Sequence, residues 1–320
     1  MNSPLAISVI IPTHNPSAER LRRTLAGLAV QTLPPDQWEV LLVDNASDQA
    51  WEPPAEACAT LPSFRRIAEP EIGLTPARLR GVAEARGALV VFVDDDNVLA
   101  PGYLEGVLRR FENQPQLGAA GGPVIPEFEQ PPPEWTREFW PLLALHEHGD
   151  QPLIHFGGPA AEWPKFAPVG AGLCVRRMAL SSYLDAVQRE PSRRHLDRRG
   201  AALSSGGDND LVFAILHSGW NVGYFPELQV THLIPAGRLA PDYLCRLNEG
   251  IMRTWVRVLA LHGQCPWRAI SRWTVPLRVA RASWRDKVWK SPAARIRWRG
   301  HVGQLLGQAD LRLQQSRSRA

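Results

Sequence analysis

Short apolar runs alternate with stretches of helical periodicity through the first 120 residues, and this alternation limits the fold more than any other feature of the sequence. The runs are rich in Val, Ile and Leu, which is typical of strands buried on both faces. Strand–helix alternation predicts a mostly parallel sheet with helices on both faces. The expected strands are 7–11, 39–43, 64–68, 88–93, 117–121 and 222–225, and the expected helices include 75–86, 101–111, 208–218 and 242–261.

Polar residues follow three of these strands directly, at 13–15, 44–45 and 94–96. In an open α/β sheet, ligands bind outside the carboxyl ends of the strands, so these residues predict a nucleotide cleft along one edge. Three consecutive aspartates there, Asp94 to Asp96, repel one another by several kcal/mol at a protein-like dielectric constant. Oxygen ligands of this kind suit Mg²⁺ or Mn²⁺. The alternative is a solvated turn whose aspartate caps the following helix.

Residues 125–168 interrupt the alternation and are rich in Pro, Trp and Phe. We expect this stretch to lie outside the regular layers of the sheet, as a lid or a wall of the substrate site. At the start of an earlier helix, Thr75 followed by Pro76 predicts an N-cap with proline in the first helical position.

The charge of the chain is divided unevenly, although its net value is only +4. Residues 263–320 carry 13 Lys and Arg against 2 Asp and Glu, together with five of the twelve tryptophans. We therefore expect a domain over 1–262, with halves at 1–122 and 123–262, and a basic, Trp-rich helical tail over 263–320. Tryptophan with cationic residues favours an anionic membrane surface or nucleic acid. No nucleic-acid motif accompanies them, so we prefer the membrane, and packing of the tail onto the domain stays open.

Other features indicate a cytoplasmic protein, with peripheral association with the inner membrane as the open alternative. The four cysteines form no CxxC pair and lack histidine at metal-ligand spacing, which indicates reduced thiols without a zinc site. The N-terminus lacks the basic region of a signal peptide. No run approaches the roughly 18 apolar residues that a membrane span needs.

Several segments in order resemble family 2 glycosyltransferases over about residues 7 to 260. The segments are 8–15 (SVIIPTHN), 31–32, 39–48 (EVLLVDNASD), 73–81 with Leu79 where asparagine is usual, 92–96 (FVDDD), 170–177, 207–211 (GDNDL), 219–220 and 230–232. The resemblance implies a GT-A fold with a Rossmann-like sheet and a DxD metal motif. It also implies a nucleoside-diphosphate-sugar donor and a saccharide or lipid-linked acceptor.

The resemblance also implies roles for individual residues. Asp94, Asp96 and His232 would hold a divalent metal, Mn or Mg, although a structural role for His232 is an equal alternative. Asp208 would be the catalytic base of an inverting transfer, with Asp210 as the second candidate, because Gly207 replaces the glutamate that is common before this aspartate. The expected nucleotide-sugar contacts are Pro12, Thr13, Asn15, Asp44, Arg78, Asp94 and Asp95, and the expected acceptor-side residues are Gly170, Ala171, Gly172 and Asp210.

Three other functions compete with an exopolysaccharide or cell-surface glycosyltransferase. A sugar-phosphate nucleotidyltransferase would need a glycine-rich basic loop after the first strand, where this chain has 13–16 (THNP). A phosphatase would leave Asp208 and the cleft residues unexplained. A non-catalytic nucleotide-sugar or polysaccharide-binding protein would bind the donor without turnover.

Overall fold

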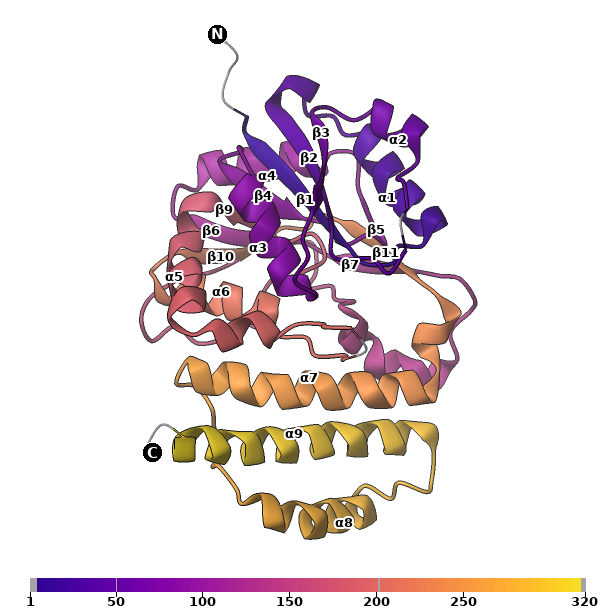
Figure 1. Cartoon of the computed structure of the whole chain (residues 1–320), viewed down its shortest axis with the longest axis vertical. Helices are drawn as coiled ribbons and strands as arrows, with labels where there is room; N and C mark the ends of the chain where they lie inside the picture. The colour runs from indigo at the N-terminus through magenta and orange to yellow at the C-terminus, as the bar shows by residue number, and fades with distance from the viewer. Residues whose placement is uncertain (1–4, 50, 201, 318–320) are drawn as a thin grey trace. The chain divides into compact units, whose positions relative to one another are not determined.

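The computed structural model describes residues 5–49, 51–200 and 202–317 (Figure 1). These residues form two compact units. Unit 1 comprises the chain up to Glu127, together with Ala144–Arg194 and Leu211–Ile234. Unit 2 comprises Phe128–Leu143, His195–Asp210 and the chain from Pro235 onward.

Unit 1 is built on a sheet of eight strands in the order β3-β2-β1-β4-β9-β6-β10-β8. Six strands run in one direction, while β9 and β8 are antiparallel to their neighbours. The predicted α/β fold with a mostly parallel sheet is therefore confirmed. The strands are β1 (Ile7–Thr13), β2 (Trp38–Asp44), β3 (Phe64–Ala68), β4 (Leu89–Phe92), β6 (Leu117–Gly121), β8 (Leu153–His155), β9 (Cys174–Arg176) and β10 (Asn221–Tyr224).

Helices cover the sheet because its strands are apolar on both sides. Ile10 and Phe92 belong to one buried cluster with side chains from α3, α5 and α6, whereas Val9 and Ile11, on the opposite face, are buried to the same extent. Alternate residues of a strand point to opposite faces, so neither face of β1 meets solvent. The helices are α1 (Ala18–Ala29), α2 (Ala55–Ala59), α3 (Leu74–Glu84), α4 (Tyr103–Asn113), α5 (Ser181–Arg189) and α6 (Gly207–His217), whose first four residues belong to unit 2.

A second sheet of three strands lies beside the turn that follows β4. Its order is β5-β11-β7, from β5 (Asn97–Leu99), β11 (Val230–Ile234) and β7 (Val124–Phe128). The antiparallel register of β11 and β5 sets His232 opposite Asn97. This pairing brings a residue from late in the chain next to the three aspartates.

Two local predictions were wrong. The stretch 125–168 contributes most of β7 and all of β8, and β8 forms an edge of the large sheet. A three-residue strand is too short to be recognised by its periodicity. Helix α3 begins at Leu74 with Gly73 as N-cap, so its first residue and its N-cap each lie two positions before the predicted ones, Pro76 and Thr75. Gly73 has a φ of 145°, which glycine adopts at little cost.

Unit 2 is helical. Its main elements are α7 (Pro241–Leu261), α8 (Val275–Arg285) and α9 (Pro292–Arg317), and α9 lies between α7 and α8 (Figure 1). Ala309 of α9 packs in a small apolar cluster with Ile270 and Val275. None of the helices in the described parts of the chain has the length and apolar character needed to cross a bilayer.

All four cysteines are free thiols. Cys174 and Cys245 are buried, whereas Cys58 in unit 1 and Cys265 in unit 2 are partly exposed. Burial raises the pKa of the Cys174 thiol to about 12 and raises that of Cys58 by less.

Candidate active site

The ends of β1, β2 and β4 meet at one edge of the large sheet. Thr13 and Asp44 are register partners in the parallel pair of β1 and β2, and Pro12 pairs with Val43 one step earlier. The Thr13 hydroxyl donates a hydrogen bond to Asp95 Oδ2, which ties the end of β1 to the acidic turn after β4. The predicted gathering of polar strand ends is therefore present within unit 1.

Asp44 is held by neighbours from its own loop and from β3. The hydroxyl of Ser47 donates to Asp44 Oδ1 at 2.7 Å, and Arg66 donates to Oδ2 at 2.9 Å. Burial alone would raise the pKa of Asp44, but these hydrogen bonds outweigh burial and place the pKa below its ordinary value. Asp44 is therefore a carboxylate at neutral pH.

Asn15 shapes the loop after β1. Its φ is +51°, a left-handed conformation that asparagine tolerates. Its side chain donates to Asp48 Oδ2 at 2.7 Å and accepts from the Asp48 backbone N–H at 2.9 Å. A cavity of about 480 Å³ opens here, and Asn15, Asp48 and Trp51 are among the residues that line it. Asn15 thus fixes the wall of a recess next to the strand ends.

Arg78 of α3 lies beside the acidic turn. It is buried, its guanidinium lies over the Phe92 ring at 5.5 Å, and its Nη2 is 3.5 Å from Asp94 Oδ1. The Asp94 side chain keeps 35% of its surface exposed, whereas Asp96 keeps 6%. Asp94 is therefore the more open of these two carboxylates, with a cation fixed beside it.

Asp96 and His232 form a buried corner of the predicted site. His232 Nε2 lies 3.5 Å from Asp96 Oδ2, and the Leu233 backbone N–H donates to the Asp96 carbonyl at 2.9 Å. The Asn97 amide donates to Asp96 Oδ1 at 3.2 Å, while the buried Asn97 Oδ1 has no partner in the described chain. The pairing of β11 with β5 creates this corner, which links strands 130 residues apart.

These side chains fit a divalent cation that is shared with a phosphate-bearing substrate. Within residues 5–49, 51–200 and 202–317, no three His, Cys, Asp or Glu side chains are grouped closely enough to hold a metal alone. Mg²⁺ is commonly held by one or two carboxylates, with substrate phosphates supplying further ligands. One buried carboxylate, an imidazole and an orphaned amide oxygen match such an incomplete protein shell.

The segment Gly170, Ala171 and Gly172 lies against the end of β4. The Gly172 backbone N–H donates to the Phe92 carbonyl at 3.0 Å, and the Tyr103 hydroxyl donates to the Gly172 carbonyl. Gly172 has a φ of +75°, and a Cβ there would lie 2.7 Å from the Tyr103 hydroxyl. Only glycine fits this position, so the segment that was predicted to lie on the acceptor side is fixed to the strand that leads into the acidic turn.

Asp208 and Asp210 belong to unit 2, at the first turn of α6. Asp208 is partly exposed, and its Oδ1 accepts from the Asn209 backbone N–H at 2.8 Å. Asp210 is fully buried, and its Oδ1 lies 2.7 Å from His262 Nε2 at the end of α7. The two aspartates therefore differ in access: only Asp208 offers a carboxylate to a solvent-borne hydroxyl.

Four residues that hold this arrangement together were given no individual role from the sequence, although Asn45 was among the polar strand-end residues expected at the cleft. Asn45 donates to the carbonyls of residues 69 and 71 and accepts from the Gly73 backbone N–H at 2.7 Å, which joins β2 to the start of α3. Asn97, Tyr103 and His262 complete the set. Asn45 and Asn97 directly follow predicted strand-end aspartates, and that adjacency is a usable signal. Tyr103 and His262 act through partners distant in sequence, which no local pattern reveals.

A comparison with known families decides the family. The profile described as "Glycosyl transferase family 2" matches residues 8–177, which is more than half of the chain and includes every strand that leads into the acidic edge. The chain belongs to glycosyl transferase family 2. The predicted family and its α/β fold are thus confirmed, and the glycosyltransferase class follows from them.

Curated proteins that are named as glycosyltransferases match parts of this chain. An "N-acetylglucosaminyltransferase" of Mesorhizobium japonicum is 29% identical over 72% of this chain and 52% of its own length. The protein of the same name from Sinorhizobium fredii is 28% identical over 73% of this chain and 54% of its own. "Putative glycosyltransferase EpsH" of Bacillus subtilis is 30% identical over 35% of this chain and 32% of its own. The chain spans about half the length of the first two relatives.

Proposed function

We propose that this family 2 member is an inverting glycosyltransferase that moves a sugar from a nucleoside-diphosphate-sugar to an acceptor hydroxyl. The observation that carries the proposal is the set of strand ends in unit 1, where Thr13, Asp44 and the acidic turn share one sheet edge. Ligands bind at this edge in open α/β sheets.

The donor is bound by the nucleotide-sugar residues of unit 1. Asp44, ionised at neutral pH, accepts a base N–H, and Thr13 and Asn15 with Pro12 form the wall beside it. Arg78 contacts the nucleotide while it keeps Asp94 oriented toward the ribose. Asp95, held by the Thr13 hydroxyl, is directed at the donor sugar.

A divalent cation, Mn²⁺ or Mg²⁺, is the proposed cofactor, held by Asp96, Asp94 and His232. When bound, the cation supplies positive charge to the diphosphate that leaves. The buried Oδ1 of Asn97, which has no partner in the described chain, supports this assignment, because an unsatisfied buried polar atom is costly and a cation nearby would offset that cost.

Asp208 is the proposed general base, and Asp210 is the second candidate. The Asp208 carboxylate takes the acceptor proton as the acceptor oxygen attacks the anomeric carbon opposite the diphosphate. Asp208 is partly exposed in the first turn of α6, which leaves its carboxylate accessible to an acceptor hydroxyl. Gly170, Ala171 and Gly172 form the acceptor side of unit 1.

The acceptor is proposed to be a saccharide or a lipid-linked saccharide of cell-surface or exopolysaccharide assembly. The names of two relatives, which concern N-acetylglucosamine transfer, favour a hexosamine donor. An anionic membrane surface is the proposed second partner, met from the cytoplasmic side, because residues 263–320 carry a net charge of +11.

A thermal-shift panel of nucleoside diphosphates and their sugars, with Mn²⁺, Mg²⁺ or chelator, tests the donor assignment. A ligand at 100 times its dissociation constant stabilises the folded state by about 2.7 kcal/mol, which raises Tm by a few degrees. We expect such a shift for at least one nucleotide and only with metal present. If no nucleoside diphosphate raises Tm under any of these conditions, the proposal is wrong.

A further inference from the structure

Helix α8 exposes a row of large apolar side chains. Trp273, just before the helix, is 93% exposed, and Leu277 and Trp284 are 77% and 74% exposed. Residues 277 and 284 are seven apart, so they lie on the same side of the helix. The ring of Trp289, 61% exposed, meets that of Trp284 edge-on at 5.3 Å. We call Trp273, Leu277, Trp284 and Trp289 the apolar stripe.

The opposite side of α8 holds the helix to the rest of unit 2. Val275 and Ala282 are buried, and Val279 packs against the cluster of Ile270, Val275 and Ala309. The exposed stripe is therefore not needed to attach α8. A contiguous apolar patch of this kind on a soluble domain usually marks an interaction site.

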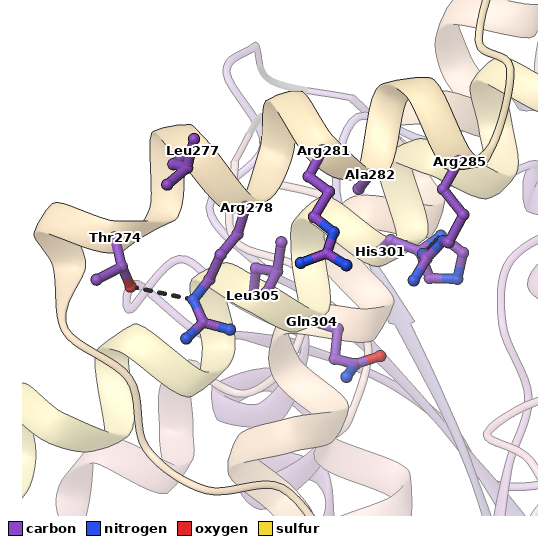
Figure 2. A pocket seen from close by; sticks show the side chains of 9 residues that line it. All are labelled: Thr274, Leu277, Arg278, Arg281, Ala282, Arg285, His301, Gln304 and Leu305. Atoms are coloured by element: carbon purple, nitrogen blue, oxygen red, sulfur yellow. Dashed lines mark hydrogen bonds between the residues drawn. The ribbon is translucent and has the colours of Figure 1, made fainter.

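Three arginines form a second row between these two sides. Arg278, Arg281 and Arg285 are three and four residues apart, and Figure 2 shows all three projecting from α8 into one pocket toward α9. The pocket has a volume of about 560 Å³. Its other lining residues are Thr274, Leu277, Ala282, His301, Gln304 and Leu305, and no acidic side chain is among the nine.

The charge of this row is only partly compensated. Arg285 lies 3.0 Å from Asp286 Oδ1 and 2.9 Å from His301 Nδ1. Burial raises the pKa of Asp286, but bonds from Arg285 and His301 outweigh burial and lower it, so Asp286 neutralises Arg285. Arg278 donates to the Thr274 hydroxyl at 3.2 Å, and neither Arg278 nor Arg281 pairs with an acid of the described chain. Two guanidinium groups are left to bind an anion.

We propose that α8 lies in the surface of an anionic bilayer, with the apolar stripe among the acyl chains and Arg278 and Arg281 on lipid phosphates. A bilayer interface offers both kinds of partner within one helix diameter, and an interfacial helix buries its apolar face along the boundary of headgroups and acyl chains. Indole rings favour this level of the membrane. Between Trp267 and Lys290 the chain has seven Arg and Lys against one Asp, which matches an anionic surface.

This inference deepens the membrane partner of the proposed function, and it concerns a different part of the chain from the donor site. Donor binding is measured without lipid, so either assignment can fail alone. A nucleic acid is the rival occupant: it would stack on the indole rings but would give Leu277 no partner.

The test is flotation of the full chain with vesicles of phosphatidylcholine, with and without phosphatidylglycerol, at low and high salt. We expect binding only with phosphatidylglycerol and weaker binding at high salt. Arg278→Gln with Arg281→Gln is expected to lower the partition coefficient about 30-fold, since each cation contributes about 1 kcal/mol. Trp273→Ser, Leu277→Ser and Trp284→Ser together are expected to lower it at least about 100-fold.

Matched controls come from unit 1. Arg189→Gln removes an exposed arginine, and Phe156→Ser removes an aromatic ring that is 76% exposed, and both variants should bind vesicles like the parent chain. Unchanged donor-induced thermal shifts verify folding of every variant. Equal losses in controls and α8 variants would overturn the proposal, as would stabilisation by inorganic phosphate or binding of single-stranded DNA without vesicle binding.

Discussion

The acidic edge of unit 1 and helix α8 of unit 2 handle charge in opposite ways. At the acidic edge three carboxylates lie beside side chains that are fixed in place: Arg66 beside Asp44, Arg78 beside Asp94 and His232 beside Asp96. On and next to α8, the apolar stripe is exposed, and Arg278 and Arg281 have no acidic partner in the described chain. Binding of a small ligand depends on a few side chains that are already held in position. Binding to an extended surface depends on many side chains that are exposed to solvent. Salt should therefore affect vesicle binding more than donor binding.

The largest expected effect separates binding from chemistry. Asp208→Asn removes the proposed base, which belongs to unit 2, and leaves the donor-binding residues of unit 1 unchanged. Transfer should therefore fall about 1,000-fold while the donor dissociation constant stays the same. Initial rates of transfer and donor titrations measure the two quantities. Asp242→Asn is the matched control, because Asp242 is also the second residue of its helix and is exposed. Near-normal transfer by Asp208→Asn would remove the assigned base.

The second effect should appear in binding itself. Asp96→Ala deletes the buried carboxylate beside His232, so metal-dependent donor binding should weaken by about 100-fold, as expected for loss of a charged ligand. Calorimetric titration with Mn²⁺ and with chelator measures it. Asp36→Ala, on an exposed turn, serves as the control. If donor affinity in the variant still depends on metal as before, the cation is held elsewhere.

A third effect tests the packing around Gly172 in unit 1. Gly172→Ala forces a side chain into a left-handed conformation and against the Tyr103 hydroxyl, so the free energy of unfolding should drop by about 2 kcal/mol or more. Gly158→Ala, where a Cβ meets nothing within 4 Å, should change it by less than about 0.5 kcal/mol. Urea denaturation gives both values. A stable, fully active Gly172→Ala protein would contradict the tight packing at this position.

The smallest effect depends on pH. The folded-state pKa of Asp44 lies below its ordinary value of 3.8, so its ionised form stabilises the fold above that value, and the stabilisation is lost as pH falls through the folded pKa. Asp44→Asn should therefore cost up to about 1 kcal/mol at pH 7 and less at pH 3, which lies below the ordinary pKa of 3.8. Denaturation curves at the two pH values measure the difference. A cost that is equal at both would exclude the Arg66 ion pair as its source.

Much of unit 1 could be predicted because its signals are local. Each buried strand is a run of Val, Ile and Leu, and the polar residues that follow it reach the same edge once the strands are parallel. Thr13, Asp44 and the acidic turn were located in this way. The partner of Asp96 came from the family resemblance, since only the pairing of β11 with β5 brings His232 to it.

The features that could not be predicted depend on contacts between residues far apart in the sequence, which no short segment contains. The three residues of β8 pair with β10 only after the chain has returned from residue 155 to residue 222. The link between Asp210 and His262 joins the start of α6 to the end of α7. Composition predicts a basic, Trp-rich tail, but it does not say which tryptophans are exposed: Trp298 donates to the Val279 carbonyl, whereas Trp273 is 93% exposed.

The distribution of the four thiols gives each unit one partly exposed cysteine to which a chemical label can be attached. Cys58 and Cys265 are the two that reagents in solution reach, and one belongs to each unit. Fluorescent probes on these two sulfurs would label both units without any engineered cysteine. Because burial raises the pKa of the Cys58 thiol, alkaline buffer speeds its modification.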